Sequence, residues 1–203
     1  MLKKTYVKFC KDVHKIRTIL NAVYKDFSIS GELTHRDKIL IDGCVISLYD
    51  RWTYFNRHII LHSAIGGCTT ARGLNIPCNV LHKRDIKLAL SNFLAARRVQ
   101  MEPKWGIASE AISVARWFSI ANFSNYSAAI GAVGSPAEEL RYVRNFFAHK
   151  GDEARTKLQK NVTFFSTYPF SHQAFLSYKV SGRQPLYENW SDRLINFAGA
   201  AIQ

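Results

Sequence analysis

SPAEELRYVRNFFAHKG, residues 135–151, carries the clearest helix signals in this chain of 203 residues. Ser135 is a favourable N-cap residue, Pro136 suits the first helical position, and Glu138 completes a capping box. Gly151 is the residue type that most easily takes the left-handed conformation past a helix end. The stretch therefore predicts one helix with a defined start and a defined stop.

This predicted helix has an apolar face and a polar end. Three apolar residues recur at the spacing typical of a helix that buries one face: Leu140, Val143 and Phe147. The last turn and a half carries Arg144, Asn145 and His149, of which the last two are four positions apart and therefore adjacent on the surface. A permanent cation, an amide and a titratable imidazole at one helix end indicate a phosphate-handling site.

The order Arg144, Asn145, three further residues and His149 resembles the signature of the HEPN superfamily. That signature is an arginine, a polar residue, three to five more residues and a histidine. The resemblance implies an all-α, antiparallel helical bundle. It also implies a metal-independent endoribonuclease of a prokaryotic toxin–antitoxin or anti-phage defence system, acting as a homodimer, with an antitoxin or another defence protein as a further partner. Some toxins of this superfamily carry a modifiable tyrosine two residues after the histidine, where this chain has Gly151, so that route of inactivation is not expected.

The resemblance assigns a role to each residue of the motif. RNA carries its own nucleophile, the 2′-hydroxyl, so its cleavage needs an acid, a base and positive charge but no metal. His149 would act as acid or base, Arg144 would stabilise the charge that gathers on the phosphate, and Asn145 would orient His149 or the phosphate. The step from Arg144 to His149 turns about 140° on an ideal helix. We therefore expect the two side chains to converge only at a loosened helix end or across a dimer.

The charge balance favours a polyanionic partner. The chain has 28 Lys and Arg against 15 Asp and Glu, a formal net charge of +13. Such an excess attracts nucleic acid first and anionic membrane surfaces second, although a basic surface can also serve solubility alone. The basic residues expected to contact RNA are Lys4, Lys8, Lys11, Lys15, Arg97, Arg98 and Lys150. The lysines among them at 4–15 recur at helical spacing, so a plain solvated helix face is the alternative.

The cysteines and the apolar runs predict a cytoplasmic protein. None of the four cysteines belongs to a Cys-x-x-Cys pair. The N-terminus does not resemble a signal peptide, and no apolar stretch of about 18 residues could span a bilayer. We therefore expect free thiols in a reducing compartment, no membrane association through a spanning helix, and no cofactor.

Hydrophobic periodicity predicts about six or seven helices in a single domain over residues 1–203. The expected helices cover residues 2–27, 37–63, 83–98, 107–123, 135–151, 152–161 and 187–201, with room for a short helix within 124–135. Residues 66–79 are expected to form a loop. Residues 162–186, rich in β-branched and aromatic residues with Pro169 and Pro185, form the irregular segment, and a hairpin or an extended arm both fit it.

Several polar residues outside the motif are weaker candidates. His58 and His62 are four positions apart, and His62, Cys68, Cys78 and His82 could together offer four ligands to zinc. Their spacing matches no zinc finger or ribbon, so a plain loop is the better interpretation. Glu138 and Glu139 are expected as cap and surface groups, Asp50 and Arg51 as a possible supporting pair, and His172 has no defined place.

Other functions stay open beside the ribonuclease. A non-catalytic HEPN-like RNA- or nucleotide-binding module, acting as a regulatory subunit of a larger complex, would share the fold and charge. A DNA-binding regulator is less favoured, because the sequence shows no convincing helix-turn-helix pattern. A serine or cysteine hydrolase has little support, because the sequence shows no nucleophile elbow and no recognisable Cys–His signature. Arginine and histidine near a helix C-terminus also stabilise the helix dipole without any further role.

Overall fold

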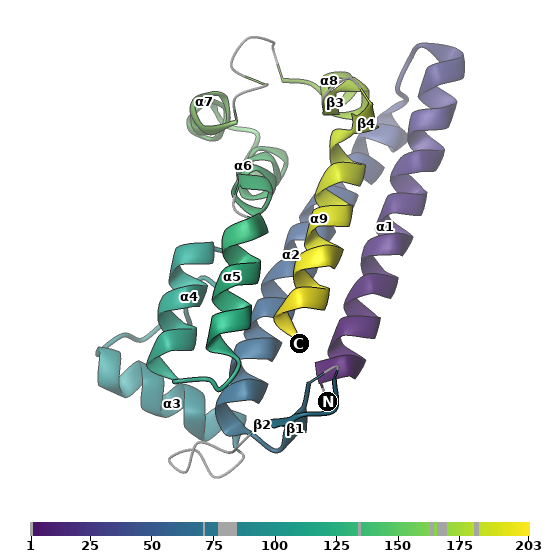
Figure 1. Ribbon diagram of the computed structural model, residues 1–203. Coiled ribbons are helices and arrows are strands. Elements are labelled where there is room, and N and C mark those ends of the chain that lie inside the picture. Colours follow the sequence, from purple (N-terminus) through teal and green to yellow (C-terminus); the bar gives the residue numbers. More distant parts are fainter. Residues whose placement is uncertain are drawn as a thin grey trace. The chain divides into compact units, whose positions relative to one another are not determined.

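A computed structural model describes residues 2–70, 72–76, 85–133, 135–162, 165, 170–180 and 183–203 (Figure 1). Over these described residues the protein is mostly helical (77%), with about nine helices and two very small hairpins. This confirms the predicted all-α class. The described helices exceed the predicted six or seven because residues 124–135 and the irregular segment each contribute one.

The elements follow one another along the chain in a simple order. The long N-terminal helices are α1 (Leu2–Ser30) and α2 (His35–Ile65). The middle of the chain contains β1 (Cys68–Thr69), β2 (Asn75–Ile76), α3 (Ile86–Arg97), α4 (Ala108–Trp117), α5 (Phe123–Val133), α6 (Ser135–His149) and α7 (Asp152–Asn161). The C-terminal part contains α8 (His172–Ser177), β3 (Lys179–Val180), β4 (Gln184–Pro185) and α9 (Leu186–Ala201). Both hairpins, β1–β2 and β3–β4, are antiparallel.

Several boundaries differ from the predicted ones for local reasons. The helix predicted over residues 107–123 ends at Trp117, because Ser119 adopts a positive φ of 50° and the chain then restarts as α5. The loop predicted at 66–79 contains the β1–β2 hairpin in its described part. Within the irregular segment, Ser171 accepts a hydrogen bond from Ala174 N–H and caps α8. Hairpin β3–β4 also lies in that segment, so its described part is ordered structure.

Contacts divide the chain into two compact units. The first comprises residues 1–10, 52–134 and 196–203, and the second comprises residues 11–51 and 135–195. Helices α1, α2 and α9 each contribute residues to both units. The single domain over residues 1–203 stays a prediction.

The first unit has an aromatic core in which two buried side chains make hydrogen bonds. Trp52 is fully buried, its ring centroid lies 4.6 Å from that of Phe197, and its indole N–H donates to the Gly106 carbonyl at 3.1 Å. The buried Tyr126 hydroxyl donates to Asn56 Oδ1 at 3.0 Å. These bonds reduce the penalty of burying polar atoms in this core.

The second unit is organised around the apolar face of α6. Leu140, Val143 and Phe147 are buried, as the sequence predicts. The Phe147 ring packs 5.9 Å from Phe175 of α8, which packs 5.9 Å from Trp190 of α9. This aromatic row fixes α6 against α8 and α9 and so positions the polar end of α6.

The helices in the described part of the chain include none that is both long and apolar enough to span a membrane.

Candidate functional site

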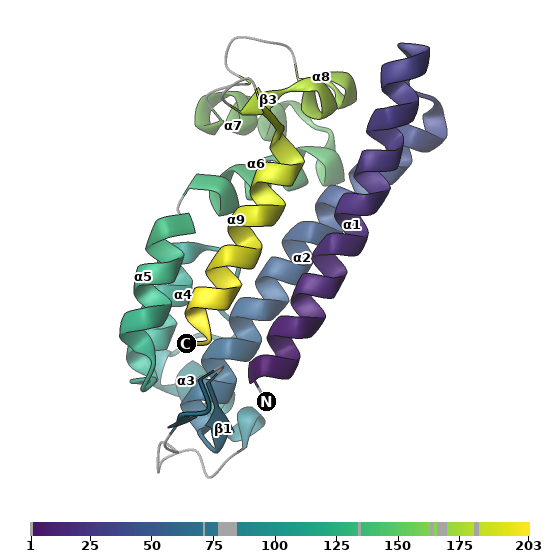
Figure 2. The ribbon, with the colours of Figure 1, turned by 45° about the vertical axis from the view of Figure 1, so that its right-hand side comes forward.

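The polar end of α6 forms a tight corner with α7, drawn in green in Figure 2. α6 continues to His149, and Lys150 then adopts a φ of 50° while its N–H donates to the Phe146 carbonyl at 2.7 Å. The predicted left-handed role of Gly151 is wrong, since Gly151 has φ −89° and is the extended N-cap residue of α7. Because α7 begins at once, the left-handed residue is placed one position earlier, at Lys150.

A cavity of about 310 Å³ opens at this corner. Asn145 and His149 both line it, so the structure confirms that these two motif residues share one surface. His149 is exposed. The cavity is completed by Arg141 and Tyr142 of α6, by Gly151, and by Glu153, Ala154 and Lys157 of α7.

Arg144 does not line this cavity. Its Nη1 donates to Asn145 Oδ1 at 3.2 Å, and its guanidinium carbon lies 6.0 Å from the centroid of the Tyr49 ring in α2. Its Nε is buried and has no hydrogen-bond partner among the residues that the structure describes. Because Asn145 Oδ1 accepts this bond, Nδ2 is the part of the Asn145 amide that can donate to a ligand. Within one chain, Arg144 thus contacts the cavity residue Asn145 but does not line the cavity with His149, in line with the angle expected between Arg144 and His149.

Two cations line the cavity, and each is paired with a carboxylate. Arg141 forms an ion pair of 2.7 Å with Glu138 and lies over the Tyr142 ring, 4.3 Å from its centroid. Lys157 forms an ion pair of 2.6 Å with Glu153. The Arg141–Glu138 pair is half-buried, whereas the Lys157–Glu153 pair is exposed. An exposed pair contributes little to stability, so Lys157 can also bind an incoming phosphate.

The two glutamates of the capping region have supporting roles. Glu138 is held by Arg141, whereas the Ser135 side chain of the predicted capping box lies outside the described atoms. Glu139 accepts a hydrogen bond of 3.1 Å from the Trp190 indole N–H. Neither glutamate lines the cavity.

Lys150 and His172 meet at Asp42 of α2. Asp42 Oδ2 lies 2.8 Å from Lys150 Nζ, and Asp42 Oδ1 lies 2.7 Å from His172 Nε2. The Asp42 side chain is only 14% exposed. The His172 ring stacks on Phe147, with centroids 5.0 Å apart. Lys150, predicted as an RNA contact, is thus engaged by a carboxylate, and the Asp42 contacts fasten the α6–α7 corner to α2.

We expect Asp42→Asn to lower the free energy of unfolding by about 1–3 kcal/mol, because it weakens two charge-assisted hydrogen bonds at a largely buried carboxylate. Urea denaturation measures the change. Asp50→Asn is the matched control, since Asp50 is an exposed carboxylate on the same helix. Equal effects of the two substitutions would contradict this role of Asp42.

The other predicted RNA contacts are all exposed: Lys4, Lys8, Lys11, Lys15, Arg97 and Arg98. Lys4, Lys8, Arg97 and Arg98 belong to the first unit, and Lys11 and Lys15 belong to the second. Exposure is required both of a phosphate-binding surface and of a solvated helix face, so the role of these residues stays a prediction.

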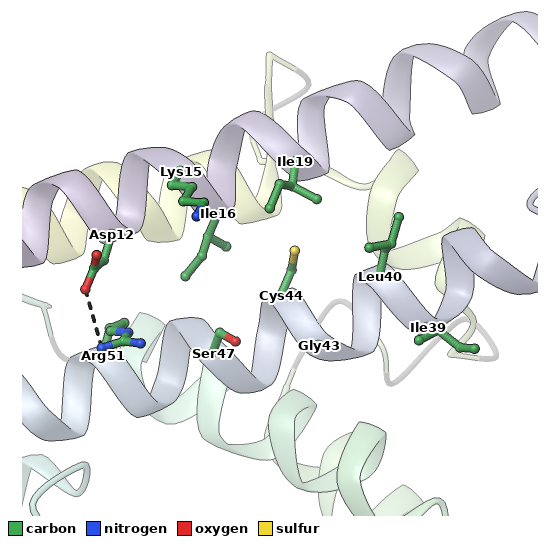
Figure 3. Close-up of a pocket in the computed structure, with 10 residues that line it drawn as sticks. All are labelled: Asp12, Lys15, Ile16, Ile19, Ile39, Leu40, Gly43, Cys44, Ser47 and Arg51. Carbon is green, nitrogen blue, oxygen red and sulfur yellow. Dashed lines mark ion pairs between the residues drawn. The ribbon is translucent and has the colours of Figure 1, made fainter.

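A second cavity, of about 390 Å³, lies between α1 and α2 within the second unit (Figure 3). Its walls are largely apolar, and Ile16, Ile19 and the Cys44 thiol point into it. Burial raises the pKa of Cys44 to about 11, which favours the protonated thiol over the thiolate. Lys15 lines the cavity, and Arg51 forms an ion pair of 3.4 Å with Asp12 rather than supporting the motif.

The histidine pair of α2 is part of the packing of the first unit. The His58 and His62 ring centroids lie 5.2 Å apart, and the His58 ring lies 4.0 Å from that of Tyr54. Burial lowers the pKa of His58 to about 4. Cys78 and His82 of the possible zinc set lie outside the described residues. In the ranges that the structure describes, no three His, Cys, Asp or Glu residues gather as metal ligands would.

Comparisons with known protein families, curated proteins and solved structures find no match. The resemblance to the HEPN superfamily therefore rests on the motif of α6 and on its setting among helices.

Four polar or charged side chains of the cavity were not predicted as site residues from the sequence: Arg141, Tyr142, Glu153 and Lys157. A signal existed for Arg141, since Arg141, Asn145 and His149 follow one another at intervals of four along one face of α6. Glu153 and Lys157 are also four apart, on α7. These faces of α6 and α7 meet because the chain turns sharply at Lys150 and Gly151. Local sequence patterns do not specify that turn.

Proposed function

We propose that this protein is a metal-independent endoribonuclease that cleaves RNA by attack of its 2′-hydroxyl, at the cavity between α6 and α7. The observation that carries the proposal is that Asn145 and His149 line one cavity together with two cationic side chains. The net charge of +13 supports an RNA partner.

The side chains in the cavity match the needs of that reaction. His149 can transfer a proton, Asn145 Nδ2 can donate to a phosphate oxygen, and Arg141 can bind two phosphate oxygens at once. Lys157 adds a second positive charge at the cavity. Arg144 is a positioning residue in this scheme, because it holds Asn145 Oδ1.

The resemblance to the HEPN superfamily supports the wider setting of the proposal. By this resemblance we propose that the enzyme acts as a homodimer in a prokaryotic toxin–antitoxin or anti-phage defence system. The cysteine usage adds the proposal of a cytoplasmic location. An antitoxin or another defence protein is the expected partner, and no cofactor is required.

The proposal is tested with an RNA and a DNA strand of the same sequence, incubated with the protein in EDTA. We expect cleavage of the RNA only, because the DNA lacks the attacking hydroxyl group and the chelator removes divalent metals. Cleavage of both strands, or cleavage that requires added Mg²⁺, would contradict the proposed chemistry.

A second candidate function is the non-catalytic RNA- or nucleotide-binding module. It is favoured by one observation: Arg144 is turned toward Asn145 and Tyr49, and both cavity cations are paired with carboxylates. Such a module would bind RNA with an affinity that falls steeply as salt rises, without cutting it. Binding without cleavage in the same RNA experiment would select this function.

A further inference from the structure

Cleavage by 2′-hydroxyl attack needs two proton-transfer groups, and the motif of α6 supplies one. One group must take the proton of the 2′-hydroxyl, and another must give a proton to the departing 5′ oxygen. His149 can perform either task, but not both in the same step. The resemblance to HEPN enzymes would meet this need with a second copy of the chain. The cavity offers another source.

Glu153 is the carboxylate of this cavity. It lies in the first turn of α7 and lines the cavity together with His149 at the end of α6. The other carboxylates near the corner are engaged elsewhere: Glu138 with Arg141, Glu139 with Trp190, and Asp42 with Lys150 and His172. Asp152, the immediate neighbour of Glu153, does not line the cavity and pairs with Arg155 at 3.6 Å.

We propose that the Glu153 carboxylate is the second proton-transfer group of the site and acts as the base, while the His149 imidazolium acts as the acid; this inference rests on the proposed function. Glu153 accepts the 2′ proton as the 2′ oxygen bonds to phosphorus. The bond from phosphorus to the 5′ oxygen breaks, and His149 donates a proton to that oxygen. The products are a 2′,3′-cyclic phosphate and a 5′-hydroxyl group, and exchange with water returns both side chains to their starting states.

The surroundings of Glu153 favour the role of base over that of acid. Its hydrogen bond with Lys157, 2.6 Å long, lowers the pKa of the Glu153 carboxyl below its ordinary value. The other titratable or charged side chains lining the cavity are Arg141, Tyr142 and His149 from α6. An ionised carboxylate can accept a proton but has none to donate.

The cavity also sets the size of what enters it. At about 310 Å³ it lies at the lower end of the range of ligand pockets, roughly 300–1,000 Å³. The Tyr142 ring forms part of its lining, with the Arg141 guanidinium carbon 4.3 Å from the ring centroid. One nucleotide of a single-stranded RNA, with its 3′ phosphate, is the class of group that this cavity would take.

The first test compares RNA cleavage in EDTA by the wild type, Glu153→Gln and Asp152→Asn. Both variants remove one negative charge at adjacent positions of α7, but only Glu153 lines the cavity. We expect Glu153→Gln to lower the cleavage rate about 100-fold or more, as loss of a general base does. Asp152→Asn should change the rate about twofold at most, since Asp152 is exposed and does not line the cavity. Equal rates for the wild type and Glu153→Gln would overturn the inference and leave the proposed function standing.

The second test separates the base from the acid. The wild type first defines a cleaved bond, and an RNA is then made with sulfur in place of the 5′ bridging oxygen at that bond. A thiolate leaves without a proton from an acid, so this substrate should restore cleavage by His149→Ala but not by Glu153→Gln. Rescue of Glu153→Gln alone would overturn the assignment of roles. Failure of the wild type to cleave any RNA would overturn the proposed function and the inference with it.

Discussion

Trp190→Ala is expected to lower the free energy of unfolding by about 3–5 kcal/mol, the usual range for removing a large aromatic side chain from a packed core. Trp190 is fully buried in α9, and its ring packs against Phe175 of α8. Its indole N–H also donates to Glu139 Oε2 of α6. The substitution therefore opens a cavity at the contact of three helices and leaves a carboxylate without its donor.

Urea denaturation followed by circular dichroism measures this effect. Trp190→Phe keeps most of the volume and removes the hydrogen bond, so we expect a smaller loss of about 1–3 kcal/mol. Trp117→Ala is the matched control, because Trp117 is 37% exposed. A loss for Trp190→Ala no greater than that for Trp117→Ala would contradict the central place of Trp190 in the second unit.

His149→Ala is expected to lower the rate of RNA cleavage in EDTA about 10²–10⁴-fold, the usual contribution of a general acid or base. His149 is the imidazole that lines the α6–α7 cavity, and it is exposed at the end of its helix. Because the side chain is exposed, the free energy of unfolding should change by no more than about 0.5 kcal/mol. Loss of activity can then be attributed to the missing imidazole and not to unfolding.

The matched control for this prediction is His14→Ala. His14 is an exposed histidine of α1 in the same unit, and it does not line the cavity. We expect His14→Ala to retain the wild-type rate within about twofold, as a substitution at an exposed position away from the site should. An equal loss for both variants would point to an effect on RNA binding through surface charge, and it would contradict a specific role for His149.

Most of the fold could be predicted because its helices are long and their signals are local. The spacing of Leu140, Val143 and Phe147 predicts the buried face of α6, and these residues are buried. α8 could not be predicted in the same way. A helix of six residues is not stable by itself, and this one depends on the burial of Phe175 and Leu176 against the rest of the unit.

The candidate site was predictable along α6 but not across the corner. Asn145 and His149 share a surface because they are four positions apart on one helix. The positions of Glu153 and Lys157 depend on the left-handed conformation of Lys150. The sequence predicted this conformation at Gly151 instead, because glycine adopts it most easily. The angle of about 140° between Arg144 and His149 on an ideal helix indicated that the two side chains diverge. The contacts of Arg144 with Asn145 and with the Tyr49 ring could not be predicted from the motif.

Analysis of the RNA ends produced in EDTA tests the proposed chemistry most directly. We predict that the wild type leaves a 2′,3′-cyclic phosphate on the upstream fragment and a 5′-hydroxyl group on the downstream fragment, and that His149→Ala leaves neither. A 3′-hydroxyl group paired with a 5′-phosphate, or cyclic phosphate in equal amounts from both proteins, would contradict cleavage by the 2′-hydroxyl at the cavity between α6 and α7.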